Sequence, residues 1–189
     1  MLDPPTPTKL TIGVMARAPV VGRCKTRLAS GMGAEAAATL YRAMLLDTLE
    51  LFEGTAADQL VVLAAPEDDG ARMLRALAPP TWRVLPQRGA GLGERLAHAI
   101  LDLSPGERHH VCLVDSDSPT IPPLALRELR SAPPRTVTLG PCDDGGYYLI
   151  GMTSPELGVF EGIPWSTAGV LPATRARCRE LGLEVRELD

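Results

Sequence analysis

The residues best suited to chemistry in this chain are carboxylates that stand at the ends of apolar runs. Asp143 and Asp144 precede two glycines between two such runs, and Asp115 and Asp117 follow a third run, Val111–Val114. Carboxylate oxygens are the ligands that hard divalent cations prefer, and glycines let the backbone approach a ligand closely. Two acidic strand ends of this kind indicate one site for Mg²⁺ or Mn²⁺ and a phosphorylated ligand.

Each acidic pair also has a simpler explanation. Positions i and i+2 of an extended chain lie on the same face, so Asp115 and Asp117 could approach one ion. The alternative is a polar turn, Asp-Ser-Asp-Ser-Pro, that caps the next helix. Asp143 and Asp144 share this ambiguity because Asp-Gly is a common turn signal. Residue type also does not tell a metal ligand from a general base.

A basic segment at residues 17–28 provides the complementary charge. It has four cations and no acid, although the whole chain has a net charge of −4. The four cations are Arg17, Arg23, Lys25 and Arg27. With Gly22 to turn the backbone, this composition suits a diphosphate, although a solvated basic turn would look the same. The segment is not a Walker A motif, because Cys24 stands where glycine is required.

Apolar runs of strand length alternate along the chain with segments of helical periodicity. Strands are predicted at residues 9–16, 59–65, 82–85, 111–114, 136–139, 147–151 and 183–188. Helices are predicted at residues 34–53, 71–77, 92–103, 122–130 and 167–181. This alternation favours an α/β fold, a three-layer Rossmann-like sandwich with a mostly parallel sheet, which binds ligands at the carboxyl ends of its strands. We expect residues 1–189 to form one domain, with a flexible N-terminus at residues 1–8.

Composition limits the class of protein. The 189 residues are within the range of one domain, and 45% are hydrophobic, enough for a sizeable core. The acidic net charge of −4 and an aromatic content of 4% argue against nucleic acid as a partner. The four scattered cysteines indicate reduced thiols in a cytoplasmic protein. We expect no signal peptide and no membrane span.

Some polar and aromatic residues have structural explanations. His109 and His110 are predicted to be an exposed pair in the loop before the Val111 strand. Tyr147 and Tyr148 alternate along a strand, so one is predicted to lie in the core and the other in the cleft. Trp165 leads into the last helix, where packing is the alternative to a place in an acceptor pocket.

Five motifs, taken in order, resemble those of a known family. They are Arg17–Leu28, Gly91–Leu96, Asp117–Pro119, Leu139–Gly151 and Ile163–Thr167. Together they resemble the bacterial glycosyltransferase-A-like proteins, described as selenodomain-associated or nucleotide-diphospho-sugar transferases. The similarity to phospholactate and molybdopterin guanylyltransferases is more distant. The resemblance implies the nucleotide-diphospho-sugar transferase fold, which is GT-A-like.

The resemblance also implies roles for individual residues. The nucleotide phosphates would be bound by Arg17, Gly22, Arg23, Lys25, Thr26, Arg27, Gly91 and Gly93. Asp117 would be the principal metal ligand, with Asp144 facing it, and both rank ahead of Asp115, where relatives often have glycine. The implied catalytic residues are Asp144, Asp143 and Lys25. An acceptor pocket would include Gly145, Gly146, Tyr147 and Trp165.

The expected function is that of a metal-dependent transferase, with Mg²⁺ or Mn²⁺ as the cofactor. It would bind a nucleotide-diphosphate sugar and transfer the glycosyl group to a small-molecule acceptor. A nucleotidyltransferase that releases pyrophosphate from a nucleoside triphosphate needs the same phosphate site and metal, so this alternative stays open. The retained carboxylates weigh against a third alternative, a non-catalytic nucleotide-binding module.

Overall fold

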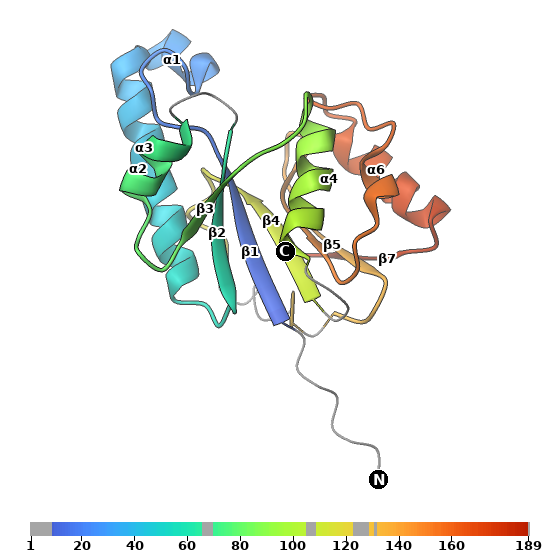
Figure 1. Cartoon of the computed structure of the whole chain (residues 1–189). Coiled ribbons are helices and arrows are strands. Elements are labelled where there is room, and N and C mark those ends of the chain that lie inside the picture. The colour runs from blue at the N-terminus through green and yellow to red at the C-terminus, as the bar shows by residue number, and fades with distance from the viewer. Residues whose placement is uncertain (1–8, 66–69, 105–108, 123–128, 131, 189) are drawn as a thin grey trace.

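The computed structural model describes residues 9–65, 70–104, 109–122, 129–130 and 132–188. Its centre is a seven-stranded sheet in the order β3-β2-β1-β4-β6-β5-β7 (Figure 1). The strands are β1 (Lys9–Ala16), β2 (Gln59–Ala64), β3 (Arg83–Pro86), β4 (His109–Asp115), β5 (Thr136–Pro141), β6 (Tyr147–Met152) and β7 (Glu184–Glu187). The helices are α1 (Thr26–Met32), α2 (Ala34–Glu53), α3 (Gly70–Leu77), α4 (Leu92–Leu103), the 3₁₀ helix η1 (Leu157–Phe160) and α6 (Val170–Glu180).

The predicted α/β fold with a mostly parallel sheet is confirmed. Every predicted strand is present, and the helix predicted at residues 34–53 has those bounds in the structure. The predicted flexible N-terminus at residues 1–8 and most of the helix predicted at residues 122–130 lie outside the described residues. Helix α1 was not predicted, because it is short and none of its residues is buried, so it has no apolar periodicity to detect.

Two hydrophobic cores cover the two faces of the sheet. Helices α2 and α3 lie on one side of the sheet, and α4 and α6 lie on the other (Figure 1). Neighbouring residues of one strand contribute to different cores, because successive side chains of a strand point to opposite faces. In β4, Cys112 and Val114 pack in the core with α2, whereas Val111 and Leu113 pack in the core with α4. The result is the predicted three-layer sandwich.

Strand β6 runs in the opposite direction to its neighbours. Strand β1 is parallel to β2 and β4, whereas β6 is antiparallel to both β4 and β5. The start of β6 therefore lies at the same edge of the sheet as the ends of β1 and β4. The Asp143–Gly146 loop joins the end of β5 to this start of β6, so it lies beside the acidic end of β4 and the basic segment after β1.

The described part of the chain contains no helix long and apolar enough to cross a membrane. All four cysteines are free, as predicted for reduced thiols.

The prediction for His109 and His110 is wrong, because strand β4 begins at His109 and both side chains are buried. His109 Nε2 lies 2.6 Å from the Thr11 hydroxyl. The His110 ring packs over Gly151, where a Cβ atom would lie 3.0 Å from Nε2. Burial lowers the pKa of both rings, that of His110 to about 4. The partners come from β1 and β6, distant in sequence, so the local pattern could not reveal this burial.

The buried His110 ring predicts an acid-sensitive fold. An unfolded chain takes up a proton near the ordinary pKa of 6.5, whereas the folded chain holds a neutral ring down to a pH of about 4. The unfolded state therefore binds more protons in this range, and stability falls as the pH drops through it. When the pH falls from neutral to about 5, we expect the free energy of unfolding to decrease by about 2 kcal/mol less in His110→Gln than in the wild type. Urea unfolding at both pH values measures this, and equal losses in the two proteins would contradict it.

Candidate functional site

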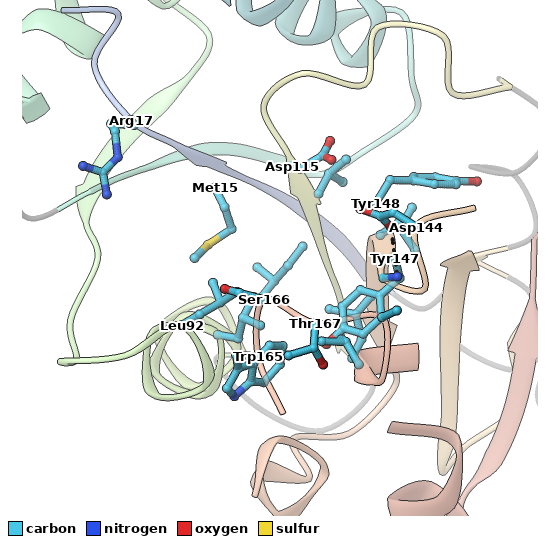
Figure 2. A pocket seen from close by; sticks show the side chains of 18 of the residues that line it. Met15, Arg17, Leu92, Asp115, Asp144, Tyr147, Tyr148, Trp165, Ser166 and Thr167 are labelled. Atoms are coloured by element: carbon cyan, nitrogen blue, oxygen red, sulfur yellow. Dashed lines mark hydrogen bonds between the residues drawn. The ribbon is translucent and has the colours of Figure 1, made fainter. Parts of the chain in front are cut away.

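A cavity of about 910 Å³ opens at the edge of the sheet where β1 and β4 end and β6 begins. The charged side chains among the described residues that line it are Arg17, Lys25, Arg27, Asp115 and Asp144. The opposite wall comes from α4 and from the segment before α6, and it includes Leu92, Trp165, Ser166 and Thr167. Figure 2 shows Asp115 and Asp144 above Trp165 and Leu92, with Arg17 to the left. The cavity thus has a charged part and an uncharged part.

Asp115 is a half-buried residue at the end of β4, opposite Met15 of β1 in the sheet register. Burial raises its pKa to about 6, and the hydrogen bond from the Ser118 side chain only partly offsets this effect. Its Oδ1 atom is buried and has no hydrogen-bond partner within the described residues. A buried polar atom without a partner costs free energy, and a cation in the cavity would remove that cost.

Asp117 has a different environment. Its carboxylate is ion-paired with Lys25, and about three tenths of each side chain is exposed (28% for Asp117 and 31% for Lys25). Lys25 immediately precedes α1 and has the left-handed backbone conformation, with φ 45° and ψ 47°. This conformation is unfavourable for a residue with a Cβ atom, and strained residues of this kind concentrate at functional sites. Asp117, the predicted principal metal ligand, is therefore already paired with Lys25, a cation of the chain itself.

The Asp143–Gly146 loop contributes one carboxylate to the cavity. Asp144 lines the cavity, and its Oδ1 accepts a hydrogen bond from the Gly146 amide at 3.0 Å. Asp143 is exposed and does not occur among the described residues that line the cavity. Of the two predicted catalytic aspartates, the structure thus brings Asp144 alone to the other site residues.

Gly145 connects this loop to the start of α6 through close packing and a hydrogen bond. Its φ is +84°, and a Cβ atom there would lie 2.3 Å from the Ala168 carbonyl oxygen. The Gly145 carbonyl accepts a hydrogen bond from the Leu171 amide at 2.8 Å. Gly145 therefore has a packing role, whereas Gly146 lines the cavity.

The uncharged wall depends on close packing between α4 and Trp165. A Cβ atom on Gly93 would lie 2.6 Å from the Trp165 indole nitrogen, so the indole fits only because position 93 is glycine. Gly93, predicted as a phosphate-binding residue, therefore has a packing role. The Trp165 side chain lines the cavity, as does Leu92, which is 46% exposed.

Tyr147 and Tyr148 both line the cavity, although they belong to different cores. Tyr147 packs against the core with α4, and Tyr148 packs against the core with α2. The alternation was predicted correctly, but the assignment of only one tyrosine to the cleft was wrong. The Tyr148 ring lies over Gly140, where a Cβ atom would be 2.4 Å from the ring.

Four other residues that were predicted to bind phosphate do not line the cavity. Gly22 makes a turn with φ 75°, Arg23 is exposed, Thr26 is the first residue of α1, and Gly91 is the N-cap of α4. None of the four occurs among the described residues that line the cavity.

Sequence reasoning missed Tyr41 of α2. Its hydroxyl bonds the backbone of Arg17 and the side chain of Ser116, so it joins the loop after β1 to the loop after β4. Its only signal was a polar group on the apolar face of a predicted helix.

The donor set at this edge fits a hard divalent cation. Asp115 provides a buried oxygen without a partner among the described residues, and Asp117, which pairs with the cavity-lining Lys25, provides a second carboxylate two residues further on. Within the described residues, no group of three or more His, Cys, Asp or Glu side chains is arranged to hold a metal ion. Mg²⁺ and similar ions commonly use one or two carboxylates and complete their coordination with water and substrate phosphates. The site thus fits an ion that binds together with a phosphorylated ligand.

Comparison with known proteins agrees with this fold. The family model described as "Uncharacterized protein conserved in bacteria (DUF2064)" matches residues 48–167. The chain is 33% identical to a "putative nucleotide-diphospho-sugar transferase" from Desulfovibrio desulfuricans G20. That comparison covers 95% of this chain and 79% of the other, with a TM-score of 0.84. No protein with a curated description matches the chain in sequence.

Two less similar structures share the fold. A nucleotidyl transferase from Methanothermobacter is 16% identical, with 96% of this chain and 88% of the other covered and a TM-score of 0.64. Glucosyl-3-phosphoglycerate synthase from Mycobacterium tuberculosis, in complex with Mn²⁺, uridine diphosphate and phosphoglyceric acid, is 13% identical. There, 95% of this chain and 68% of the other are covered, with a TM-score of 0.56. The predicted resemblance to nucleotide-diphospho-sugar transferases is confirmed, and the chain belongs to the DUF2064 family.

Proposed function

We propose that this chain is a metal-dependent transferase that binds a nucleotide-diphosphate sugar and transfers its glycosyl group to a small-molecule acceptor. One observation carries the proposal: Arg17, Lys25 and Arg27 line the same cavity as Asp115 and Asp144. Cations suit the diphosphate, and a carboxylate such as Asp115 suits a divalent ion that would bind together with it. The cavity of about 910 Å³ is at the upper end of the range of about 300–1,000 Å³ for small-molecule sites.

The three cations would bind the diphosphate and hold it in one orientation. Arg17 and Arg27 can each offer a planar pair of N–H donors to phosphate oxygens, whereas the Lys25 ammonium acts as a point charge. During glycosyl transfer the bond between the sugar and the diphosphate breaks, and negative charge grows on the departing nucleoside diphosphate. Positive groups that are already in place stabilise that charge.

Asp115 and Asp117 would hold the divalent cation, and Asp144 would serve as the general base. Asp117 follows the end of β4, and besides burial its charge raises the pKa of Asp115, so the two carboxylates lie close enough to reach one ion. When bound, the cation would neutralise part of the charge on the leaving diphosphate. Asp144 lines the same cavity as Tyr147 and Trp165, where we place the acceptor. It would take the proton of the acceptor hydroxyl as that oxygen attacks the anomeric carbon.

A nucleotidyl transfer is the second candidate. The observation that favours it is the similarity of fold to a nucleotidyl transferase, at a TM-score of 0.64. In that reaction an acceptor phosphate would attack the α-phosphorus of a nucleoside triphosphate, and pyrophosphate would leave. Glycosyl transfer would release a nucleoside diphosphate, whereas nucleotidyl transfer would release pyrophosphate.

The product released from each donor distinguishes the candidates. We expect Mn²⁺-dependent release of nucleoside diphosphate from one of a panel of nucleotide sugars, with water as a slow acceptor. Ligands that bind the folded state also raise the thermal midpoint, so a thermal-shift screen should identify the donor first. Pyrophosphate release from a nucleoside triphosphate would favour the second candidate. The absence of any shift or release would contradict both.

Asp144→Asn tests the division of roles between the carboxylates. The substitution keeps the shape of the side chain and an oxygen that can accept the Gly146 amide hydrogen bond. We expect Mn²⁺ and donor affinities to stay within about twofold of wild type, because no ligand is removed, while turnover falls by a factor of about 10²–10⁴ with the loss of the base. Titration of Mn²⁺ followed by single-turnover kinetics measures both quantities. A loss of Mn²⁺ binding would instead assign Asp144 as a metal ligand.

Asp115→Asn should have opposite effects on stability and on metal binding. Burial raises the pKa of Asp115 to about 6, from an ordinary value of 3.8. Stability is therefore lost as the pH rises from 3.8 to about 6, and above this window the charged carboxylate is unfavourable in the folded state. We expect the variant to be about 2 kcal/mol more stable than wild type in metal-free buffer at mildly alkaline pH. Mn²⁺ should raise the thermal midpoint of the wild type only, and an equal rise in both proteins would contradict the role of Asp115.

A further inference from the structure

Tyr41 lies beneath the two loops that carry the cations and the carboxylates of the site. It belongs to α2 and is 1% exposed, so its phenol is enclosed by the protein. The phenol lies 3.1 Å from the Arg17 amide nitrogen, 3.0 Å from the Arg17 carbonyl oxygen and 2.8 Å from the Ser116 hydroxyl. Arg17 follows β1, and Ser116 follows β4. One hydroxyl thus connects the segment after β1, which carries Arg17 and Lys25, to the segment at the end of β4, which carries Asp115 and Asp117.

These three contacts saturate the hydroxyl. A phenol has one proton to donate and two lone pairs that accept. The proton can go to the Arg17 carbonyl, while the Arg17 amide and the Ser116 hydroxyl donate to the oxygen. Because the bonding capacity of Tyr41 is used completely, the relative position of the two loops is well defined at this point.

The ring of Tyr41 also holds Lys25. The Lys25 ammonium lies 5.2 Å from the ring centroid, within the range of a cation–π interaction, and the same ammonium pairs with Asp117. Lys25 reaches this position from a left-handed backbone conformation. The side chain also lines the cavity. Lys25 is therefore the ion-pair partner of Asp117 in this structure, and it also lies where it could contact a phosphate in the cavity.

We propose that Tyr41 is a positioning residue that holds Lys25 for two alternative partners. Without ligands, Lys25 neutralises Asp117. When a divalent cation binds Asp117, it displaces the ammonium, and Lys25 is directed to the phosphates of the bound nucleotide. This inference rests on the proposed function in one respect, since it assumes that a divalent cation and phosphates bind in this cavity.

The exchange has a consequence for affinity. A cation that binds Asp117 must first break the pair with Lys25, so Lys25 weakens the binding of the metal alone. Phosphates provide a second partner for the released ammonium and therefore favour the metal-bound arrangement. Metal and diphosphate would then bind cooperatively, because each removes an obstacle to the other.

The test measures Mn²⁺ alone, without nucleotide, by the electron paramagnetic resonance signal of the free ion. We expect Lys25→Gln to bind Mn²⁺ about threefold to tenfold more tightly than wild type, because the competing ammonium is absent. The same variant should bind inorganic pyrophosphate more weakly in metal-free buffer. A phosphate-binding lysine without the exchange would weaken pyrophosphate binding and leave Mn²⁺ affinity unchanged, and that result would overturn the proposal.

Two control variants separate the exchange from a general change of charge. Arg23→Gln removes an exposed positive charge from the same loop and should change Mn²⁺ affinity by less than about twofold, since it leaves the Lys25–Asp117 pair in place. In an Asp117→Asn background, Lys25→Gln should no longer raise Mn²⁺ affinity. A rise that persists without Asp117 would overturn the proposal.

Tyr41→Phe tests the positioning role, because it removes the hydroxyl and keeps the ring. The matched control is Thr48→Val, which removes another buried hydroxyl of α2, one bonded to the Met44 carbonyl of the same helix. We expect both variants to lower the thermal midpoint, but only Tyr41→Phe should weaken pyrophosphate binding, by about threefold or more. Equal pyrophosphate affinities in the two variants would reduce Tyr41 to a structural residue and overturn its positioning role.

The failure of this proposal can be distinguished from the failure of the proposed function. If wild type binds Mn²⁺ as expected and Lys25→Gln binds it no more tightly, the exchange is wrong and the transferase proposal stands. If the exchange is observed but no nucleotide donor is turned over, the transferase proposal is wrong. If no variant binds Mn²⁺, both the exchange and the proposed metal site are wrong.

Discussion

The candidate site depends on the tight turn between β5 and β6. Strand β6 is antiparallel to both β4 and β5, so β5 ends at the same edge of the sheet as β4. The Asp143–Gly146 loop joins the end of β5 to the start of β6 and therefore lies at the edge where β1 and β4 end. The hydrogen bond from Leu171 to Gly145 then ties this loop to α6. Carboxylates from the end of β4 and from this turn meet cations of the segment after β1 in one cavity, because all three segments lie at this edge of the sheet.

Charge compensation is the second constraint on this edge of the sheet. Asp115 is half-buried, with a buried oxygen that has no hydrogen-bond partner among the described residues, whereas Asp117 is paired with Lys25. The fold therefore keeps one carboxylate in an unfavourable state and supplies the other with a cation of its own. A charged group in such an environment lowers stability, and unfavourable arrangements of this kind concentrate at functional sites.

Glycines near the cavity act mainly through packing. A Cβ atom would collide with the Trp165 indole at Gly93, with the Tyr148 ring at Gly140 and with the Ala168 carbonyl at Gly145. The group that requires the glycine comes from a segment distant in the sequence at Gly93 and Gly145, and from the neighbouring strand of the same hairpin at Gly140. The resemblance to a known family placed Gly93 near phosphates, and the sequence had no means of detecting the Trp165 indole against that position.

The sequence by itself determined the alternation of strands and helices, because apolar periodicity reports which side chains of a segment are buried. It also determined the acidic strand ends and the basic segment, because these depend only on residue type and spacing. Only the tertiary structure decided the burial of His110, the pairing of Lys25 with Asp117 and the link made by Tyr41, since each needs partners from other strands or helices. Local patterns record which side chains of a segment avoid water, whereas the environment of a charged group depends on which distant segments the fold brings to it.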